Sequence, residues 1–186
     1  MGTFLLILTG AALVGVLWFL RRWVWSFPGQ KSYDYDGTGP NFDIRDHLKG
    51  PILCEGVIYG PTGRVTSRFT ADFEASWEEN RGRMVENFRY DSGNTQRREW
   101  RLEVGPGGAI KANADDLVGE GEGQQAGCSV SLKYKIRLPE EAGGHVLDAT
   151  DWMYLVGDGV IVNRSQFRKF GIKVAELVAT MRPKEA

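Results

Sequence analysis

The chain is poor in the residues on which most enzyme chemistry depends. Its 186 residues include only two cysteines, Cys54 and Cys128, and two histidines, His47 and His145. Two cysteines are too few for a disulfide scaffold or a zinc cluster. Two histidines far apart in the chain leave little room for histidine-based acid–base or zinc chemistry. We therefore expect neither a metal site nor a cofactor.

Familiar catalytic and nucleotide-binding motifs are absent as well. The sequence has no Gly-x-Ser-x-Gly, no His-Glu-x-x-His, no P-loop and no Cys-x-x-Cys. The Gly-rich stretch at 119–123 contains two glutamates that would repel a phosphate, so it indicates a mobile turn. With 23 basic and 24 acidic side chains, the formal net charge is -1. This balance gives no reason to expect a nucleic-acid partner.

What the sequence does have is one long apolar run near its start. No charged residue occurs between Phe4 and Leu20, and at about 1.5 Å per residue this run covers roughly 25 Å, the short end of a spanning helix. Trp23 lies where an interfacial aromatic residue is expected. A cleavable signal peptide is the alternative, but it typically has basic residues before the run and a small-x-small site after it. Neither is present, so residues 1–25 are expected to be an uncleaved transmembrane anchor.

Two arginines indicate which way this anchor is oriented. Arg21 and Arg22 follow the apolar run directly, and no basic side chain precedes it. Basic residues beside a membrane span stay on the cytoplasmic side. We therefore expect a single-pass protein of the bacterial inner membrane whose remaining chain faces the cytoplasm. That remaining chain is net acidic, so the helix rather than a charged face is expected to hold it to the membrane.

The rest of the chain alternates between apolar and polar residues. Residues 26–50 are rich in Gly, Pro, Asp and Ser and indicate a tether. From Pro51 onward the dominant period is two, which is typical of strands with one buried face. Gly-containing turns separate these runs. The pattern predicts an all-β antiparallel meander barrel of about nine strands over residues 51–182, followed by a tail at 183–186.

The last run, residues 170–182, fits either a helix stripe or a strand face. We favour a strand because it would close the barrel.

One hairpin can be tested for register. A three-residue loop at 92–94 places Glu86 opposite Trp100 and carries Glu86 and Arg98 inward. A buried charge requires a partner, so these two residues are expected to form a diagonal ion pair. The pair is interpreted first as a plug at one end of the barrel and second as part of a ligand site.

Further candidates lie between residues 148 and 171. A hairpin there brings together two aromatic residues and several polar ones, namely Trp152, Tyr154, Asn163, Arg164 and Arg168. An aromatic barrel mouth with guanidinium groups suits an acyl chain with an anionic head. Core aromatics capped by stacked arginines explain the same residues without a ligand.

Several short motifs resemble those of an uncharacterised bacterial family, domain of unknown function 3833. They are GPTGR at 60–64, FRYDSG at 88–93, RREW at 97–100, DWMY at 151–154, NRS at 163–165 and KFG at 169–171. The resemblance implies a lipocalin-like barrel and, for many members, a lipoprotein outside the inner membrane. Here a spanning helix followed by arginines replaces the lipidated cysteine. The resemblance thus suggests the periplasm as the alternative location, and it assigns no catalytic residue.

Three functions remain open from the sequence. The first is a non-catalytic barrel that binds a lipid, an acyl chain or another apolar molecule beside the membrane. The second is an accessory subunit whose helix docks in a larger membrane complex through its small residues. The third is a lipid-modifying enzyme that uses Glu86, Asp148 or Asp151 as acid or base, although no nucleophile–base pair is visible.

Overall fold

The computed structural model describes residues 2–184 and divides into two compact units, residues 1–34 and 35–186. The first unit contains α1 (Gly2–Trp23) and the short 3-10 helix η1 (Phe27–Gly29). Residues Gly2–Arg21 of α1 have a mean hydropathy of 2.3 and the length needed to cross a membrane. Membrane anchors and signal sequences share these features. The side chains of Arg22 and Trp23, expected to lie at the membrane interface, are outside the part of the chain that the structure describes.

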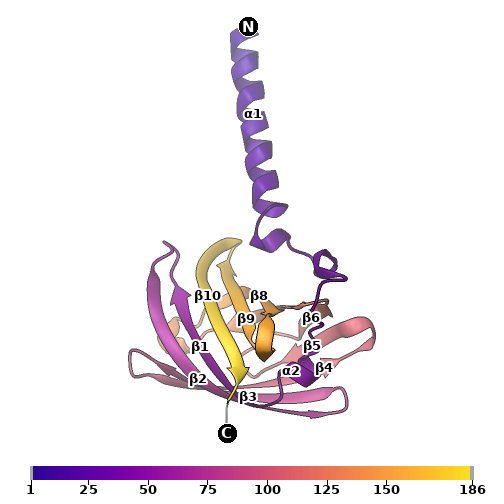
Figure 1. Ribbon diagram of the computed structural model, residues 1–186. Helices are drawn as coiled ribbons and strands as arrows, with labels where there is room; N and C mark the ends of the chain where they lie inside the picture. The colour runs from indigo at the N-terminus through magenta and orange to yellow at the C-terminus, as the bar shows by residue number, and fades with distance from the viewer. Residues whose placement is uncertain (1, 185–186) are drawn as a thin grey trace. The chain divides into compact units, whose positions relative to one another are not determined.

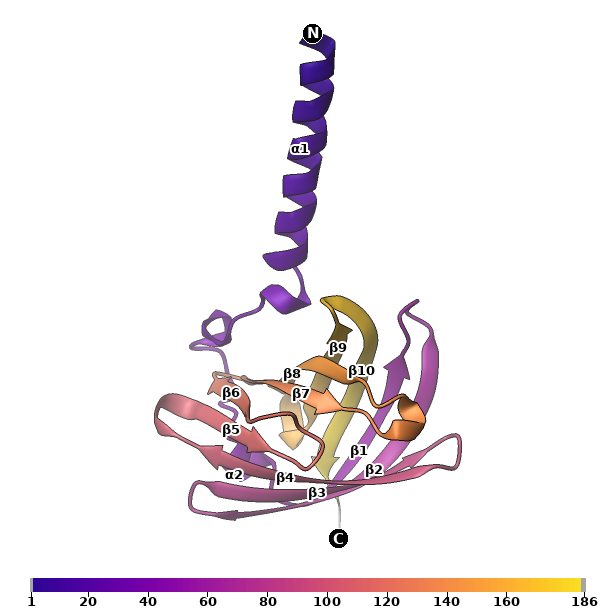
Figure 2. The same ribbon diagram turned by 180° about the vertical axis from the view of Figure 1, so that it is seen from behind.

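The second unit is an all-β barrel that closes on itself (Figure 1). Each strand pairs antiparallel with its sequence neighbours, and β1 pairs with β10 to complete the closure. The strands are β1 (Gly50–Tyr59), β2 (Val65–Glu78), β3 (Arg81–Tyr90), β4 (Thr95–Val104), β5 (Ala109–Asn113), β6 (Gly121–Ala126), β7 (Ser129–Arg137), β8 (Val146–Leu155), β9 (Ile161–Lys169) and β10 (Ile172–Pro183). Figure 2 shows the same wall of strands from behind. The all-β meander is confirmed, and so is a strand at the C-terminal end.

The described strands number ten rather than about nine, and part of the difference lies in a Gly-rich stretch. Residues 121–123, expected to be part of a turn, begin β6. A side chain at Gly123 would collide with Leu132 on the neighbouring strand. Glycine is therefore required for close approach of the two strands, and the same glycines remove the alternating pattern that would have identified a strand.

The β3–β4 hairpin has a register two residues away from the expected one. Its loop is 91–93 instead of 92–94, because Tyr90 N–H donates to the carbonyl of Asn94 at 2.9 Å. Gly93, with φ of 87°, takes the left-handed position at the end of this three-residue loop. Glu86 consequently lies opposite Arg98. A shift of two residues preserves the face, so both side chains still point inward.

Part of the expected tether belongs to the barrel core. Phe42, Ile44 and Leu48 are almost fully buried in the same apolar cluster as the strand residues. The short helix α2 (Ile44–His47) lies here, and Trp77 Nε1 donates to the carbonyl of Leu48 at 2.7 Å. The tether assignment is therefore wrong for this stretch. Three widely spaced apolar residues among Gly, Pro and Asp produce no periodic signal.

Alternation of strand direction divides the turns between two ends of the barrel. The α2 end carries the β2–β3, β4–β5, β6–β7 and β8–β9 turns and is covered by residues 42–48. The other end, named here the β9–β10 end, carries the β1–β2, β3–β4, β5–β6, β7–β8 and β9–β10 turns. In Figure 1 α2 and the β9–β10 turn lie at opposite ends of the barrel.

Candidate functional site

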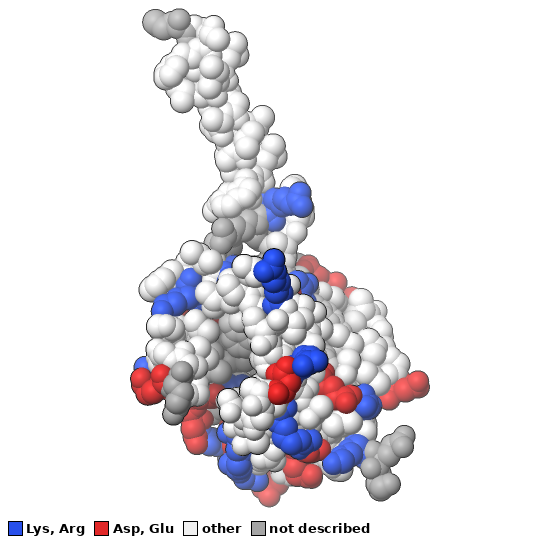
Figure 3. Space-filling model, turned by 90° about the vertical axis from the view of Figure 1, so that its left-hand side faces the viewer, with Lys and Arg blue, Asp and Glu red and all other residues white. Residues whose placement is uncertain are grey.

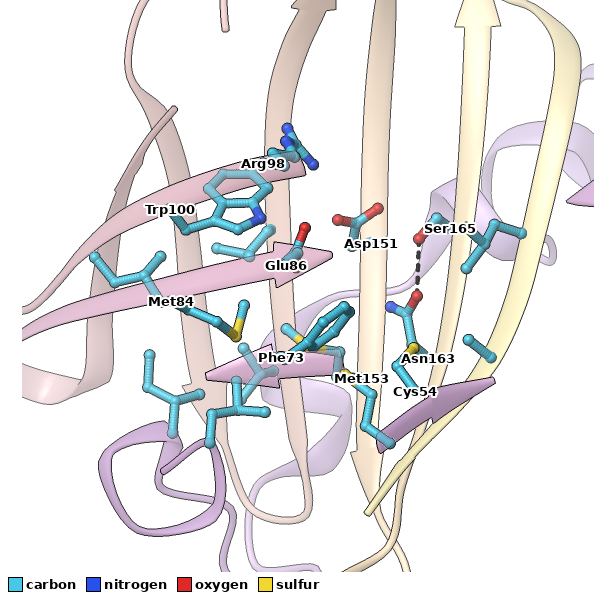
Figure 4. Close-up of a pocket in the computed structure, with 18 of the residues that line it drawn as sticks. Cys54, Phe73, Met84, Glu86, Arg98, Trp100, Asp151, Met153, Asn163 and Ser165 are labelled. Atoms are coloured by element: carbon cyan, nitrogen blue, oxygen red, sulfur yellow. Dashed lines mark hydrogen bonds between the residues drawn. The ribbon is translucent and has the colours of Figure 1, made fainter. Parts of the chain in front are cut away.

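The barrel encloses a cavity of about 120 Å³. Ile44, Leu48, Met84 and Leu102 line its part toward the α2 end. A cluster of polar side chains on five strands lines the rest, formed by Glu86, Arg98, Tyr134, Asp151, Asn163 and Ser165. Figure 4 shows all of these except Tyr134 as labelled side chains. Most of the lining is apolar, so the cavity combines an apolar body with one polar region.

Arg98 is the cation of this cluster. Its Nε lies 3.0 Å from Asp116 Oδ2, and Asp116 stands in the loop between β5 and β6. The guanidinium carbon lies 4.0 Å from the ring centroid of Trp100, while Tyr134 meets that indole edge-on at 5.2 Å. The expected diagonal pair with Glu86 is therefore replaced by a direct ion pair with Asp116, whose pairing with Arg98 no sequence pattern indicates.

Two acidic side chains share the buried space with Arg98. Burial raises the pKa of Glu86 to about 7, against the opposing effects of the Arg98 charge and the Trp100 indole. Burial also raises the pKa of Asp151, although hydrogen bonds from Ser165 and Tyr134 act in the opposite direction. Two carboxyl groups with raised pKa values beside one arginine are typical of functional sites, and they also occur in structural ion-pair networks.

Two polar atoms of the cluster have no hydrogen-bond partner in the described part of the chain. They are Arg98 Nη2 and Asp151 Oδ1, and both are buried. Beside them, Ser165 Oγ donates to Asn163 Oδ1 at 3.1 Å. An unpaired buried donor and an unpaired buried acceptor are costly, which makes them the chemically available atoms of the cavity.

The raised pKa of Glu86 predicts that the barrel loses stability as pH rises. The native state keeps the Glu86 proton up to about pH 7, whereas the unfolded chain releases it near the ordinary value of 4.5. The free energy of unfolding should therefore fall by about 3 kcal/mol between these pH values and level off above them. Urea unfolding across this range measures the effect. Glu86→Gln should reduce the slope and leave only the contribution of Asp151, while an unchanged slope would contradict the assignment.

Half of the ligand candidates selected from the sequence face the cavity. Glu86, Arg98, Trp100 and Asn163 line it. The remaining candidates lie on the outer face of the barrel wall: Trp152, Tyr154, Arg164 and Arg168 alternate with the inward Asp151, Met153, Ser165 and Phe167. The expectation of an aromatic barrel mouth that contains Trp152 and Tyr154 therefore differs from the structure.

Trp152 is nevertheless buried, because a second layer covers it. Tyr35 lies on the outside of β8, with ring centroids 5.3 Å from Trp152 and 5.5 Å from Tyr154. The nearby guanidinium group of Arg164 pairs with Glu176 on β10. Both faces of β8 are thus buried, so alternation alone could not identify the inner one.

Of the two remaining acid–base candidates, one faces the cavity and the other faces solvent. Asp151 lines the cavity, whereas Asp148 is exposed and lies 3.8 Å from Lys135 Nζ. Cys54 also lines the cavity, and burial raises the pKa of its thiol to about 12, so it remains protonated. Tyr134 and Ser165 belong to the site although the sequence reasoning did not select them. Tyr134 alternates with polar residues along β7, which indicates an inward face, whereas Ser165 has no distinguishing signal in the sequence.

Comparisons with known proteins identify a family and a fold. A family model described as "Protein of unknown function (DUF3833)" matches residues 22–183. The comparison with curated proteins gave no match. Rv2717c from M. tuberculosis, of known crystal structure, is similar with a TM-score of 0.56 and 14% identity, over 80% of this chain and 99% of that one. BF2203 from Bacteroides fragilis, described as having a YmcC-like fold, covers the same shares at 11% identity with a TM-score of 0.35. At 14% identity the first likeness shows the fold alone.

Proposed function

The chain belongs to the DUF3833 family of proteins of unknown function, and on that premise we propose that it is a membrane-anchored barrel that binds a small apolar molecule with a polar end. The observation that carries this proposal is the mixed lining of the cavity. An apolar region and a buried polar cluster with an unpaired donor and an unpaired acceptor occur in one cavity. Apolar pockets with a few convergent polar groups are the usual form of ligand sites.

The cavity limits the size of this ligand. Its volume is about 120 Å³. An engineered cavity of about 150 Å³ in another protein holds benzene. The barrel therefore suits a short apolar group, such as the terminal segment of an acyl chain, and a longer molecule would have to displace lining side chains.

The polar cluster limits the chemistry of the ligand's polar end. Arg98 Nη2 is the free donor and Asp151 Oδ1 the free acceptor. A hydroxyl or amide group can accept from the first and donate to the second. An anionic head is less suitable, because Asp116 already pairs with Arg98 and both Glu86 and Asp151 border the same space.

A cavity-filling variant tests the proposal. Ala179 on β10 lines the cavity, and leucine at this position would occupy part of its volume. The full-length protein, released from detergent into native mass spectrometry, is expected to retain a small apolar species. Ala179→Leu should lose this bound mass, while Thr180→Leu, the next residue on the same strand and on the outer face, should keep it. A wild-type protein without bound mass, or equal retention by both variants, would contradict ligand binding.

Membrane anchoring by α1, with the barrel on the cytoplasmic side, is part of the same proposal. It is supported by the apolar length of the helix and by Arg21 near its C-terminal end.

A second candidate function, an accessory subunit of a membrane complex, is favoured by Gly10 and Gly15, which leave open space on the helix surface. Exchange of α1 for an unrelated anchor distinguishes the two, since only the accessory subunit requires its own helix. The described site has buried acids but no nucleophile–base pair, so an enzyme remains the third candidate.

A further inference from the structure

The turn between β9 and β10 presents a large aromatic side chain to solvent. It is a two-residue turn formed by Phe170 and Gly171, with Lys169 opposite Ile172. Phe170 is 91% exposed and Ile172 is 64% exposed. Both turn residues have positive φ, 52° and 75°, as in the type I′ turns that connect tightly paired strands.

The backbone at Phe170 makes this exposure unusual. Type I′ turns favour asparagine or glycine at the first position, because most other residues are strained at positive φ. A phenylalanine there contributes neither favourable backbone geometry nor burial to the isolated barrel. Strain of this kind at an exposed residue is a reason to look for a function outside folding.

Basic side chains surround this aromatic residue. Lys169 Nζ lies 5.7 Å from the ring of Phe170, and Arg168 and Lys173 complete the hairpin tip. Two acidic groups lie beside them. Glu176 pairs with both Lys173 and Arg164, and Asp148 on β8 lies opposite Arg168. The tip therefore combines exposed apolar side chains with an excess of positive charge.

The adjacent turn extends the same surface. β1 lies between β10 and β2, so the β1–β2 turn is the neighbour of the hairpin tip along the barrel wall. This turn contributes Arg64 and the half-exposed Val65. We name these residues the docking face: Arg64, Val65, Arg168, Lys169, Phe170, Ile172 and Lys173. Elsewhere acidic and basic side chains are interspersed, as Figure 3 shows for one side of the barrel.

We propose that the docking face inserts Phe170 and Ile172 into the interfacial region of a bilayer that contains anionic lipid. This inference rests on the proposed membrane anchor. Aromatic and aliphatic side chains bind at the headgroup boundary while nearby basic residues attract anionic lipid. The chain between Trp23 and Tyr35 spans at most roughly 40 Å when fully extended, which keeps an anchored barrel within reach of the membrane. The face lies at the β9–β10 end, away from residues 42–48 that cover the α2 end.

The docking face can be tested with a fluorescent label in the full-length protein. Val65→Cys provides a half-exposed attachment site on the face, Cys128→Ser removes the accessible native thiol, and Cys54 is buried. The labelled protein is placed in nanodiscs of phosphatidylcholine with or without phosphatidylglycerol. We expect a blue shift of the label's emission that is larger with phosphatidylglycerol.

Phe170→Asn then separates docking from folding. Asparagine suits the positive φ of this turn, so the melting temperature should stay equal or rise while the blue shift is lost. Glu79→Asn is the matched control, because Glu79 has nearly the same φ of 53° in the β2–β3 turn at the α2 end. It should keep the shift. An incorporated protein whose label never shifts, or shifts equally in both variants, would overturn docking alone. A chain that fails to incorporate would overturn both the anchor and the docking that rests on it.

Discussion

Replacement of Arg98 by methionine is expected to lower the free energy of unfolding of the barrel by about 3–5 kcal/mol. Arg98 is the cation that faces Asp116, Glu86 and Asp151. Its removal would leave the ionised Asp116 without its partner and would withdraw the charge that partly offsets burial of Glu86. Methionine keeps most of the side-chain length over Trp100, so the loss would report the charge rather than the packing. Urea unfolding of the full-length protein in detergent measures it.

An exposed ion pair provides the control for Arg98→Met. Arg83 on β3 pairs with Glu99 on β4 at 2.7 Å, and the Arg83 side chain is more than half exposed. Pairs of this kind contribute little to stability because water and salt screen them. Arg83→Met should therefore unfold almost as the wild type does. If the two variants lost equal stability, the buried polar cluster would not carry the energetic role assigned to it.

Phe42→Ala is expected to be similarly destabilising, by about 3–5 kcal/mol. Phe42 is 1% exposed, within the segment that covers the α2 end of the barrel, and its N–H donates to the carbonyl of Gly127 at 2.8 Å. Truncation to alanine would leave a void between this segment and the barrel core. Since the remaining side chains are held by closed strand pairing, the void could collapse only in part. The measurement is again urea unfolding, followed by near-ultraviolet circular dichroism.

Tyr33 provides the comparison for Phe42. It is 70% exposed and belongs to the first structural unit, only nine positions earlier in the chain. Tyr33→Ala should leave the unfolding curve unchanged. A flexible tether over the whole of 26–50 would make the two substitutions equally harmless. That outcome would show that residues 42–48 do not stabilise the barrel by covering its α2 end.

The inward position of Glu86, Arg98 and Trp100 was predictable although the hairpin register was not. Side chains on a strand alternate with a period of two, so the difference of two residues between the expected and observed registers kept each of them on the same face. The partner of Arg98 was not predictable in the same way. Asp116 lies in a loop beyond the next strand, and no local pattern relates the two positions.

The sequence by itself determined the apolar N-terminal helix and the all-β meander, because each is encoded in the spacing of neighbouring residues. The spacing of residues 170–182 fits a helix or a strand equally, and closure of the barrel decides for the strand. Only the tertiary structure decided which side of β8 faces the cavity. Asp151 and Met153 line it, while Trp152 is covered from outside by Tyr35. A strand buried on both faces has no polar face to mark the exterior. Which of its faces becomes the interior depends on closure of the barrel and on a covering segment more than a hundred residues away in the chain.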